Sequence, residues 1–215
     1  MAYDVVIFDL DGTLLDTLDD LMDSCNYALS TIGAPPRTRA EIRRFVGNGI
    51  RNLMLQAVPD GEANPKFEQA YETMQTWYKA HNQIKTAPYP GVQQLIRTLK
   101  QQGVPMAVVS NKPDASVQML VEQWFPEITF GLGEKEGLRR KPERDMVDYA
   151  IAQLGQTGKK TVYVGDSEVD LTTAANAGLD CISVTWGFRD RALLVERGAK
   201  QFADTAEELL RLIQG

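Results

Sequence analysis

The feature that most constrains the fold is the segment VVIFDLDGT at residues 5–13. Val5 to Phe8 form a short apolar run that does not alternate with polar residues, which is typical of a strand buried on both faces. Asp9 and Asp11 follow it directly. Two carboxylates at the end of a buried strand are costly unless a partner or a cation compensates their charge. The segment therefore raises the question of why a core strand delivers two acids to one place.

Three further apolar runs indicate more buried strands. Each is followed by a turn and a helix-like stretch, and helical patterns that end near glycines precede them, with those glycines placed as C-caps. Strands and helices in alternation predict an α/β fold with a Rossmann-like parallel sheet and helices on both faces. The runs cover residues 104–109, 161–164 and 181–184, and the capping glycines are Gly103, Gly158 and Gly178.

The stretch between the first and second strands is too long for one crossover, and it contains only helical patterns. One apolar face runs from Leu18 to Ile32 and is closed by Gly33. We therefore expect a helical cap domain at residues 16–88, inserted into a catalytic core of residues 1–15 and 89–215, with hinges near 16–17 and 87–90. Further helix starts are a capping box of Thr38 with Glu41, and Asn64 with Pro65 as N-cap and first residue.

Composition limits the kinds of partner. The 215 residues carry a net charge of −6, which argues against non-specific nucleic-acid binding. No apolar run approaches the roughly 18 residues that span a membrane, and we identify no signal peptide. Cys25 and Cys181 fit no metal or disulfide framework, so we expect reduced cysteines in a cytoplasmic protein.

Polar side chains follow three of the predicted strands. Ligands bind beyond the carboxyl ends of strands in an open parallel sheet, so these side chains are expected to form one site. Asp170 lies one helical turn beyond Asp166 and can return to the same side. The strand-end segments are Asp9-Leu10-Asp11, Ser110-Asn111-Lys112 and Gly165-Asp166-Ser167, and Lys141-Pro142 precedes the strand that leads to Asp166.

These residue types favour phosphoryl chemistry. Carboxylates are ligands for Mg²⁺, which we expect as the cofactor, and a carboxylate can attack phosphorus to form an aspartyl phosphate. Asp11 could protonate the leaving oxygen and then activate water. A lysine would neutralise the phosphoryl oxygens, and the turn amides with the Ser110 hydroxyl would hold the remaining oxygens. Thr13 and Asn111 are further candidate substrate contacts.

Four segments together resemble the haloacid dehalogenase superfamily, in that family's order and over essentially the whole chain. They are DLDGTL at 9–14, VVSNK at 108–112, KP at 141–142 and GDSEVD at 165–170. The segments FVGNGIRNLM at 45–54 and WGFRDR at 186–191 look most like the phosphoglycolate phosphatase group.

The resemblance implies a role for each motif residue. Asp9 would be the nucleophile, Asp11 the general acid and base, Ser110 a phosphate ligand, and Lys141 the group that neutralises the transferring phosphoryl. Asp9, Asp166 and the main-chain carbonyl of Asp11 would bind Mg²⁺, with Asp170 supporting the metal from nearby or through water. The family's sheet order would place the first strand centrally, between the family's second and fourth strands, bringing Asp9, Ser110 and Asp166 together.

Several residues leave two interpretations open. The Gly47-Asn48-Gly49 stretch is either a helix–helix turn or, with help from Arg51, a set of amides that binds a substrate carboxylate. Lys112 either contacts substrate or is exposed beside Pro113, and Arg140 competes with Lys141 for its role. Arg144 stands where many relatives have a second proline, so we expect a changed turn there. His81 is expected to be structural.

We therefore expect a magnesium-dependent phosphatase that acts on a small phosphorylated metabolite, best matched by 2-phosphoglycolate. Pyrophosphate, a nucleotide or a sugar phosphate are alternative substrates, and a sugar-phosphate mutase or a catalytically silent binding domain are alternative functions. A dehalogenase does not need Asp11, and a phosphonate hydrolase would need a cap lysine before Lys66. Monomer and homodimer remain open.

Overall fold

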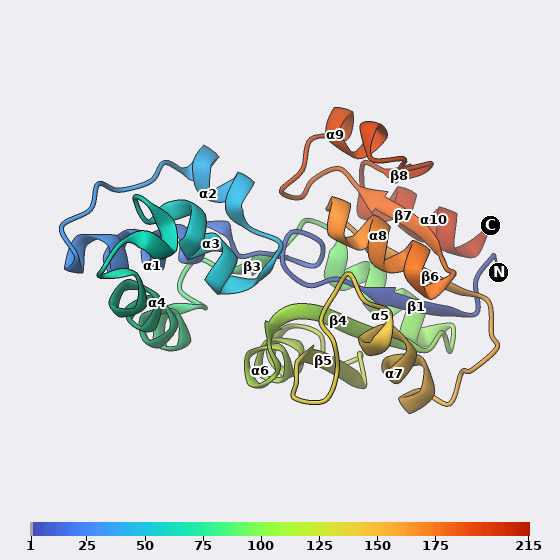
Figure 1. Cartoon of the computed structure of the whole chain (residues 1–215). Coiled ribbons are helices and arrows are strands. Elements are labelled where there is room, and N and C mark those ends of the chain that lie inside the picture. Colours follow the sequence, from blue (N-terminus) through green and yellow to red (C-terminus); the bar gives the residue numbers. More distant parts are fainter. Residues whose placement is uncertain (1) are drawn as a thin grey trace. The chain divides into compact units, whose positions relative to one another are not determined.

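The computed structural model describes residues 2–215 and divides the chain into two compact units (Figure 1). One unit runs to Leu15 and resumes from Pro88 to Gly215, and the other comprises Asp16–Ala87. The first contains a six-stranded sheet, and the second is built from helices. No helix within residues 2–215 has the length and apolar character needed to cross a membrane.

The sheet is parallel throughout, and β1 (Val5–Phe8) lies between β4 (Met106–Pro113) and β6 (Thr161–Gly165). Phe8 pairs with Val108 on one side and with Val164 on the other, so all three strands end at the same edge. The predicted central position of the first strand is confirmed. The strand order is β5-β4-β1-β6-β7-β8, where β5 is Phe130–Glu134, β7 is Asp180–Val184 and β8 is Gln201–Ala203.

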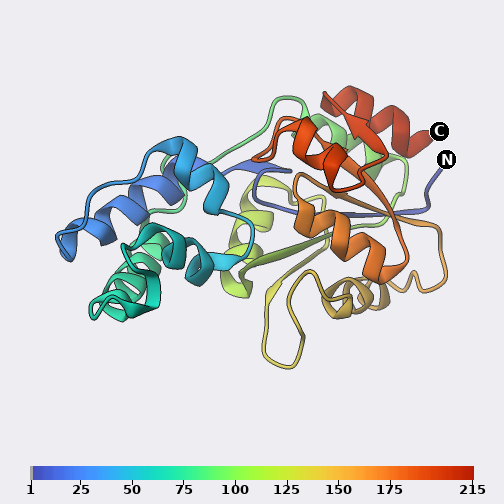
Figure 2. The same cartoon turned by 45° about the horizontal axis from the view of Figure 1, so that its top comes forward.

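Helices cover both faces of this sheet, as the alternation of strands and helices predicted (Figure 2). Because β1 is buried on both faces, Val6 and Phe8 pack into one apolar cluster while Val5 and Ile7 pack into the other. The first cluster includes residues of α5 (Val92–Gln101), α6 (Asp114–Trp124) and α10 (Ala206–Gln214), and the second those of α7 (Asp145–Gln153) and α8 (Glu168–Ala177). The short helix α9 spans Arg191–Glu196.

The helical unit contains four α-helices and one 3₁₀ turn. Thr38 and Glu41 form both halves of the predicted capping box, which starts the second helix. The bounds are α1 Leu18–Thr31, α2 Arg39–Phe45, α3 Gly49–Ala57, the 3₁₀ turn Gly61–Ala63 and α4 Phe67–His81. A two-stranded pair, β2 (Leu15–Asp16) with β3 (Ala87–Pro88), lies where the chain passes between the units.

Two predicted helix boundaries are wrong. Asn64 does not cap α4: its side chain accepts a hydrogen bond from the Lys66 amide in a local turn, and α4 starts only at Phe67. Asparagine next to proline favours such a turn over a helix start. Gly158 does not close α7 either, because that helix ends at Gln153 and the left-handed residue that follows is Gly155.

Candidate active site

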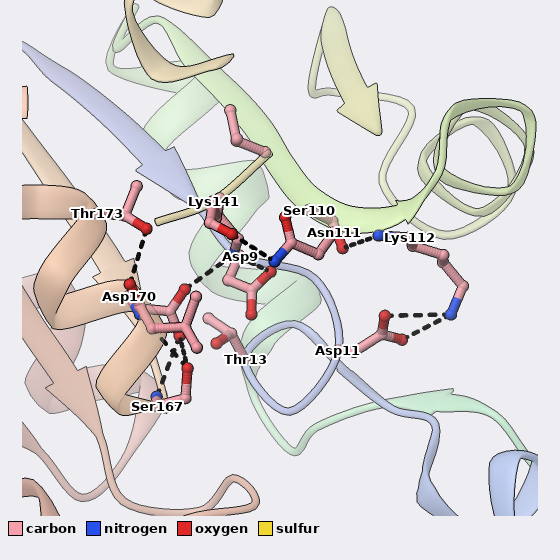
Figure 3. Close-up of polar contacts among 12 residues, drawn as sticks. Asp9, Asp11, Thr13, Ser110, Asn111, Lys112, Lys141, Ser167, Asp170 and Thr173 are labelled. Atoms are coloured by element: carbon pink, nitrogen blue, oxygen red, sulfur yellow. Dashed lines mark hydrogen bonds and ion pairs between the residues drawn. The ribbon is translucent and has the colours of Figure 1, made fainter. Parts of the chain in front are cut away.

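The carboxyl ends of β1, β4 and β6 bring three polar side chains to one edge of the sheet (Figure 3). Asp9 follows β1 directly, Ser110 lies near the end of β4, and Asp166 follows β6. All three are buried, with 8%, 2% and 1% of their surface exposed. Buried carboxylates need compensating partners, so the contacts of each acid determine what the site can do.

Lys141 supplies the positive charge of the site. Its Nζ lies 2.8 Å from Asp9 Oδ1 and 2.8 Å from Asp170 Oδ1, and it donates to the Tyr163 hydroxyl at 2.9 Å. Burial alone would lower the pKa of this lysine, but Asp170 and Asp9 outweigh burial and hold the pKa well above its ordinary value. Lys141 therefore stays charged beside the carboxylate that is the candidate nucleophile.

Asp170 is tied into the start of α8, where it forms a capping box with Ser167. Its Oδ2 accepts hydrogen bonds from the Ser167 hydroxyl at 2.6 Å, the Ser167 amide at 3.0 Å and the Asp166 amide at 3.2 Å. Its Oδ1 faces Lys141. Both oxygens are thus engaged by the protein, and Asp170 links the lysine to the turn that carries Asp166.

Asp166 is held by two backbone segments that approach it closely. Phe188 donates its amide to Oδ2 at 2.6 Å, and Thr13 donates its hydroxyl to Oδ1 at 3.2 Å. A Cβ at Gly12 would lie 2.5 Å from Asp166 Oδ2, and one at Gly187 would lie 2.4 Å from Asp166 Cβ. Glycine at both positions is what leaves space for the carboxylate.

These acids fit a divalent cation. Carboxylate oxygens of Asp9, Asp166 and Asp170 lie within 4.8 Å of one another. Burial, followed by repulsion from Asp170, raises the pKa of Asp9 to about 7 and raises the pKa of Asp166 well above its ordinary value. Three carboxylates face one lysine here, so their ionised forms leave two negative charges to balance. Oxygen donors of this kind suit a hard divalent ion.

Asp11 turns away from this cluster and pairs with Lys112 (Figure 3). Lys112 Nζ donates to the two carboxylate oxygens of Asp11 at 2.9 and 3.1 Å. Only 5% of Lys112 is exposed, so the interpretation that it is a solvated lysine beside Pro113 is wrong. The reason is that Asp11, three residues beyond the end of β1, offers a carboxylate that offsets the cost of burying the ammonium.

The neighbouring residues of β4 fix the loop that carries Lys141. Asn111 donates its side-chain amide to the Lys141 carbonyl at 3.0 Å, and its Oδ1 has no hydrogen-bond partner among the described residues. The Ser110 hydroxyl accepts from the Lys112 amide at 3.3 Å and donates to no group within residues 2–215, so its proton can serve a ligand. Arg140 is exposed and pairs with Glu134, so Lys141 and not Arg140 reaches the acids.

The match to known proteins agrees with this geometry. The family model described as haloacid dehalogenase-like hydrolase matches residues 6–184. The chain belongs to the haloacid dehalogenase-like hydrolase family. The resemblance seen in the motifs is therefore confirmed, and so is the predicted α/β fold class.

Several relatives of this haloacid dehalogenase-like hydrolase are described as phosphoglycolate phosphatases. A phosphoglycolate phosphatase of Pseudomonas putida is 32% identical over 86% of this chain and 70% of its own length. One from Agrobacterium fabrum is also 32% identical, over 86% of this chain and 82% of its own. The crystal structure of a phosphoglycolate phosphatase candidate from Lactobacillus delbrueckii is 40% identical, covers 99% of each chain and has a TM-score of 0.94.

The candidate residues of the helical unit form a local arrangement in this hydrolase. Gly47 and Gly49 have positive φ values of 125° and 76°, and Asn48 precedes α3 without a side-chain capping bond. Arg51 donates to Glu62 at 2.9 Å and to Glu68 at 2.7 Å. A role for these four residues in substrate binding stays a prediction.

His81 has contacts of a structural kind. Its ring stacks on Trp77 with centroids 3.9 Å apart, and its Nδ1 lies 2.8 Å from the Trp77 carbonyl oxygen.

Sequence reasoning missed two contributors to the site of the hydrolase, Tyr163 and Gly187. Tyr163 is a strand residue whose apolar neighbours suggested only a core position, yet its hydroxyl contacts Lys141 and lies 3.3 Å from Asp170 Oδ1. Ser167, one of the predicted strand-end residues, closes the capping box with Asp170. Gly187 lies in the WGFRDR segment, which the sequence had already singled out. Only the structure shows the physical reason for a glycine there, which is its close approach to Asp166.

Proposed function

We propose that this protein is a Mg²⁺-dependent phosphatase that hydrolyses 2-phosphoglycolate through an aspartyl-phosphate intermediate. The observation that carries the proposal is the contact between Asp9 and Lys141, beside Asp166, at the carboxyl edge of the sheet. A catalytically silent binding domain has no need for a buried acid whose charge is balanced in this way. Membership of a hydrolase family and the names of the relatives support the reaction class.

The first step of the proposed reaction is an attack by Asp9. One of its carboxylate oxygens forms a bond to phosphorus while the bond from phosphorus to the ester oxygen breaks. Lys141 offsets charge on the phosphoryl oxygens, and the Ser110 hydroxyl donates to one of them. Asp11 gives its proton to the departing oxygen of glycolate, which leaves as the alcohol.

The second step regenerates the enzyme. Asp11, now ionised, takes a proton from water as that water attacks phosphorus. The bond from phosphorus to the Asp9 oxygen breaks, and inorganic phosphate and free Asp9 result. The same two carboxyl groups thus complete both steps, and no further reactant is needed.

Asp9, Asp166 and the main-chain carbonyl of Asp11 would hold Mg²⁺, with Asp170 behind them. When bound, the ion supplies positive charge that favours ionised Asp9 and offsets charge on the phosphoryl group. Burial and the neighbouring Asp170 raise the pKa of Asp9, so added positive charge beside this carboxyl group favours its ionised form. We further propose a cytoplasmic enzyme for a small metabolite, active as a monomer or homodimer.

The test measures phosphate released from a panel of esters that includes 2-phosphoglycolate, pyrophosphate, nucleotides and sugar phosphates. We expect the highest kcat/KM for 2-phosphoglycolate, loss of activity with a chelator, and recovery with Mg²⁺. Asp9→Asn should reduce kcat by about 10³-fold or more, since the amide is a poor nucleophile of similar shape. Full activity after exhaustive chelation, or in Asp9→Asn, would refute the proposal.

A further inference from the structure

The ion pair between Asp11 and Lys112 is a second charged arrangement, beside the acidic cluster. The side chain of Lys112 is 3% exposed and that of Asp11 is 18% exposed. Both oxygens of Asp11 face the same ammonium, at 2.9 and 3.1 Å. A buried lysine that holds a carboxylate in this way fixes the direction of that carboxylate.

The backbone of β4 fixes the place of Lys112. The pairing of β4 with β5 is regular from Ala107 to Val109 and then shifts before Pro113 pairs with Glu134. Such an irregularity re-aims the side chains within it, and these include Ser110 and Lys112. The strand β5 comes so close that a Cβ at Gly133 would lie 2.5 Å from the Lys112 carbonyl oxygen. The lysine is therefore placed by two strands and not by a loose loop.

This arrangement conflicts with the role that Asp11 has in the proposed function. Asp11 has to reach the ester oxygen of the substrate, but in the structure its carboxylate is held by Lys112. For the reaction to proceed the pair has to open, and opening leaves the ammonium of a buried lysine without that carboxylate. Losing a charge-assisted hydrogen bond of this kind costs about 1.5–3 kcal/mol, which corresponds to roughly 10- to 100-fold in a rate or binding constant.

A carboxylate on the leaving group would compensate that cost. In 2-phosphoglycolate a single methylene group joins the carboxylate to the ester oxygen. When Asp11 turns to this oxygen, the carboxylate of the substrate therefore lies close to the position beside Lys112 that the Asp11 carboxylate has vacated. Asp9 and Asp11 are separated by one residue, which limits their Cα separation to about 7 Å. The substrate's own carboxylate can therefore replace that of Asp11 at Lys112 while its phosphoryl group faces Asp9.

We propose that Lys112 is a substrate-binding residue that exchanges Asp11 for an anionic group on the leaving side of the substrate. The inference rests on the proposed function, and it defines the substrate class as phosphate monoesters with a carboxylate next to the ester carbon. The exchange releases the Asp11 carboxylate from Lys112 only when such a substrate is present. The released carboxylate takes up a proton from solvent and can then turn to the leaving oxygen as the acid. Esters with a neutral leaving group have to open the pair without compensation.

The first experiment compares 2-phosphoglycolate with 2-hydroxyethyl phosphate, which has a neutral hydroxymethyl group in place of the carboxylate. Lys112→Met should lower kcat/KM for 2-phosphoglycolate by about 10- to 100-fold and lower it for 2-hydroxyethyl phosphate by about threefold or less. The control is Lys160→Met, which removes the same charge from an exposed residue just before β6, at the opposite end of the strands. It should change neither value.

The second experiment measures binding and does not depend on turnover. In an Asp9→Asn background, Asp11→Asn removes the resting partner of Lys112. Calorimetry should show that Asp11→Asn lowers the Kd of 2-phosphoglycolate more than the Kd of 2-hydroxyethyl phosphate, with a difference between the two effects of about tenfold. Adding Lys112→Met to the same protein should abolish the difference. This measurement decides the matter even if Lys112→Met alone does not fold.

The outcomes separate the two proposals. If the wild-type protein hydrolyses both esters and Lys112→Met lowers both equally, Lys112 only positions Asp11, and this inference alone is overturned. An equal decrease in the Kd of both ligands in Asp11→Asn also overturns the inference about Lys112, because only the general charge of the site has then changed. If the wild-type protein releases no phosphate from either ester, the proposed function fails as well.

Discussion

The close approach of Gly187 to the acidic cluster predicts a large effect from adding one methyl group. In Gly187→Ala the new Cβ would lie 2.4 Å from Asp166 Cβ and 2.4 Å from the Gly12 carbonyl oxygen. Ordinary van der Waals contact begins at 3.4 Å, so the two segments have to separate by about 1 Å. Backbone lies on one side and a hydrogen-bonded carboxylate on the other, so neither side yields easily.

The expected magnitude follows from that displacement. Overpacking of a buried site typically costs about 1–3 kcal/mol of folding free energy. A shift of about 1 Å in a catalytic group lowers activity by roughly 10²-fold. We therefore expect Gly187→Ala to raise the Mg²⁺ concentration for half-maximal activity, and to lower kcat/KM by about that factor.

The assay is a Mg²⁺ titration of phosphate release, together with thermal unfolding with and without Mg²⁺. Gly131→Ala in β5 is the matched control, since the nearest atoms to its new Cβ would be those of the Val117 and Val121 side chains of α6, at 3.3 Å. It should fold and respond to Mg²⁺ like the wild type. If Gly187→Ala folds and keeps the Mg²⁺ dependence and kcat/KM of the wild type, the assignment of Asp166 as a metal ligand held in place by the close approach of Gly187 is refuted.

Two further predictions concern the groups around Lys141. Tyr163→Phe should lower the free energy of unfolding, measured in urea, by about 1–2 kcal/mol and should also lower kcat, because Lys141 and Asp170 lose a buried hydroxyl partner. An unchanged free energy of unfolding would contradict this role of the Tyr163 hydroxyl. The second follows from the Asp9 pKa, raised to about 7 by burial and by Asp170. A carboxyl group whose pKa is higher in the folded state than in the unfolded state stabilises the fold while it is protonated. The melting temperature of the metal-free protein should therefore decrease as the pH rises from about 4 to about 7. Mg²⁺ should restore it most at the upper end, and Asp9→Asn should flatten the metal-free curve.

Local sequence patterns predicted the elements whose signals are contained within a few residues. The run Val5–Phe8 coincides with β1, since an uninterrupted apolar run has little choice but burial on both faces. Gly178 ends α8 in the left-handed conformation, as the position of the glycine indicated. The Asp-x-Asp spacing placed two carboxylates beyond β1 for the same local reason.

Contacts between distant segments could not be predicted in this way. The strand β5 has the sequence FGLGE, and two glycines give it little strand propensity, yet Gly133 is what lets β4 approach. The direction of Lys112 depends on the register shift in β4, which leaves no mark in a single sequence. Tyr163 looked like a core residue, because only the fold brings Lys141 to its hydroxyl.

The stereochemical course at phosphorus tests the central claim most directly. Each in-line displacement inverts the configuration, so transfer first to Asp9 and then to water predicts overall retention. The measurement uses 2-phosphoglycolate made chiral at phosphorus with oxygen isotopes and a thiophosphoryl group, hydrolysed in isotopically labelled water with Mg²⁺. Retention is the predicted result and does not require the intermediate to accumulate. Inversion would mean that water attacks the substrate directly, and it would contradict the assignment of Asp9 as the nucleophile.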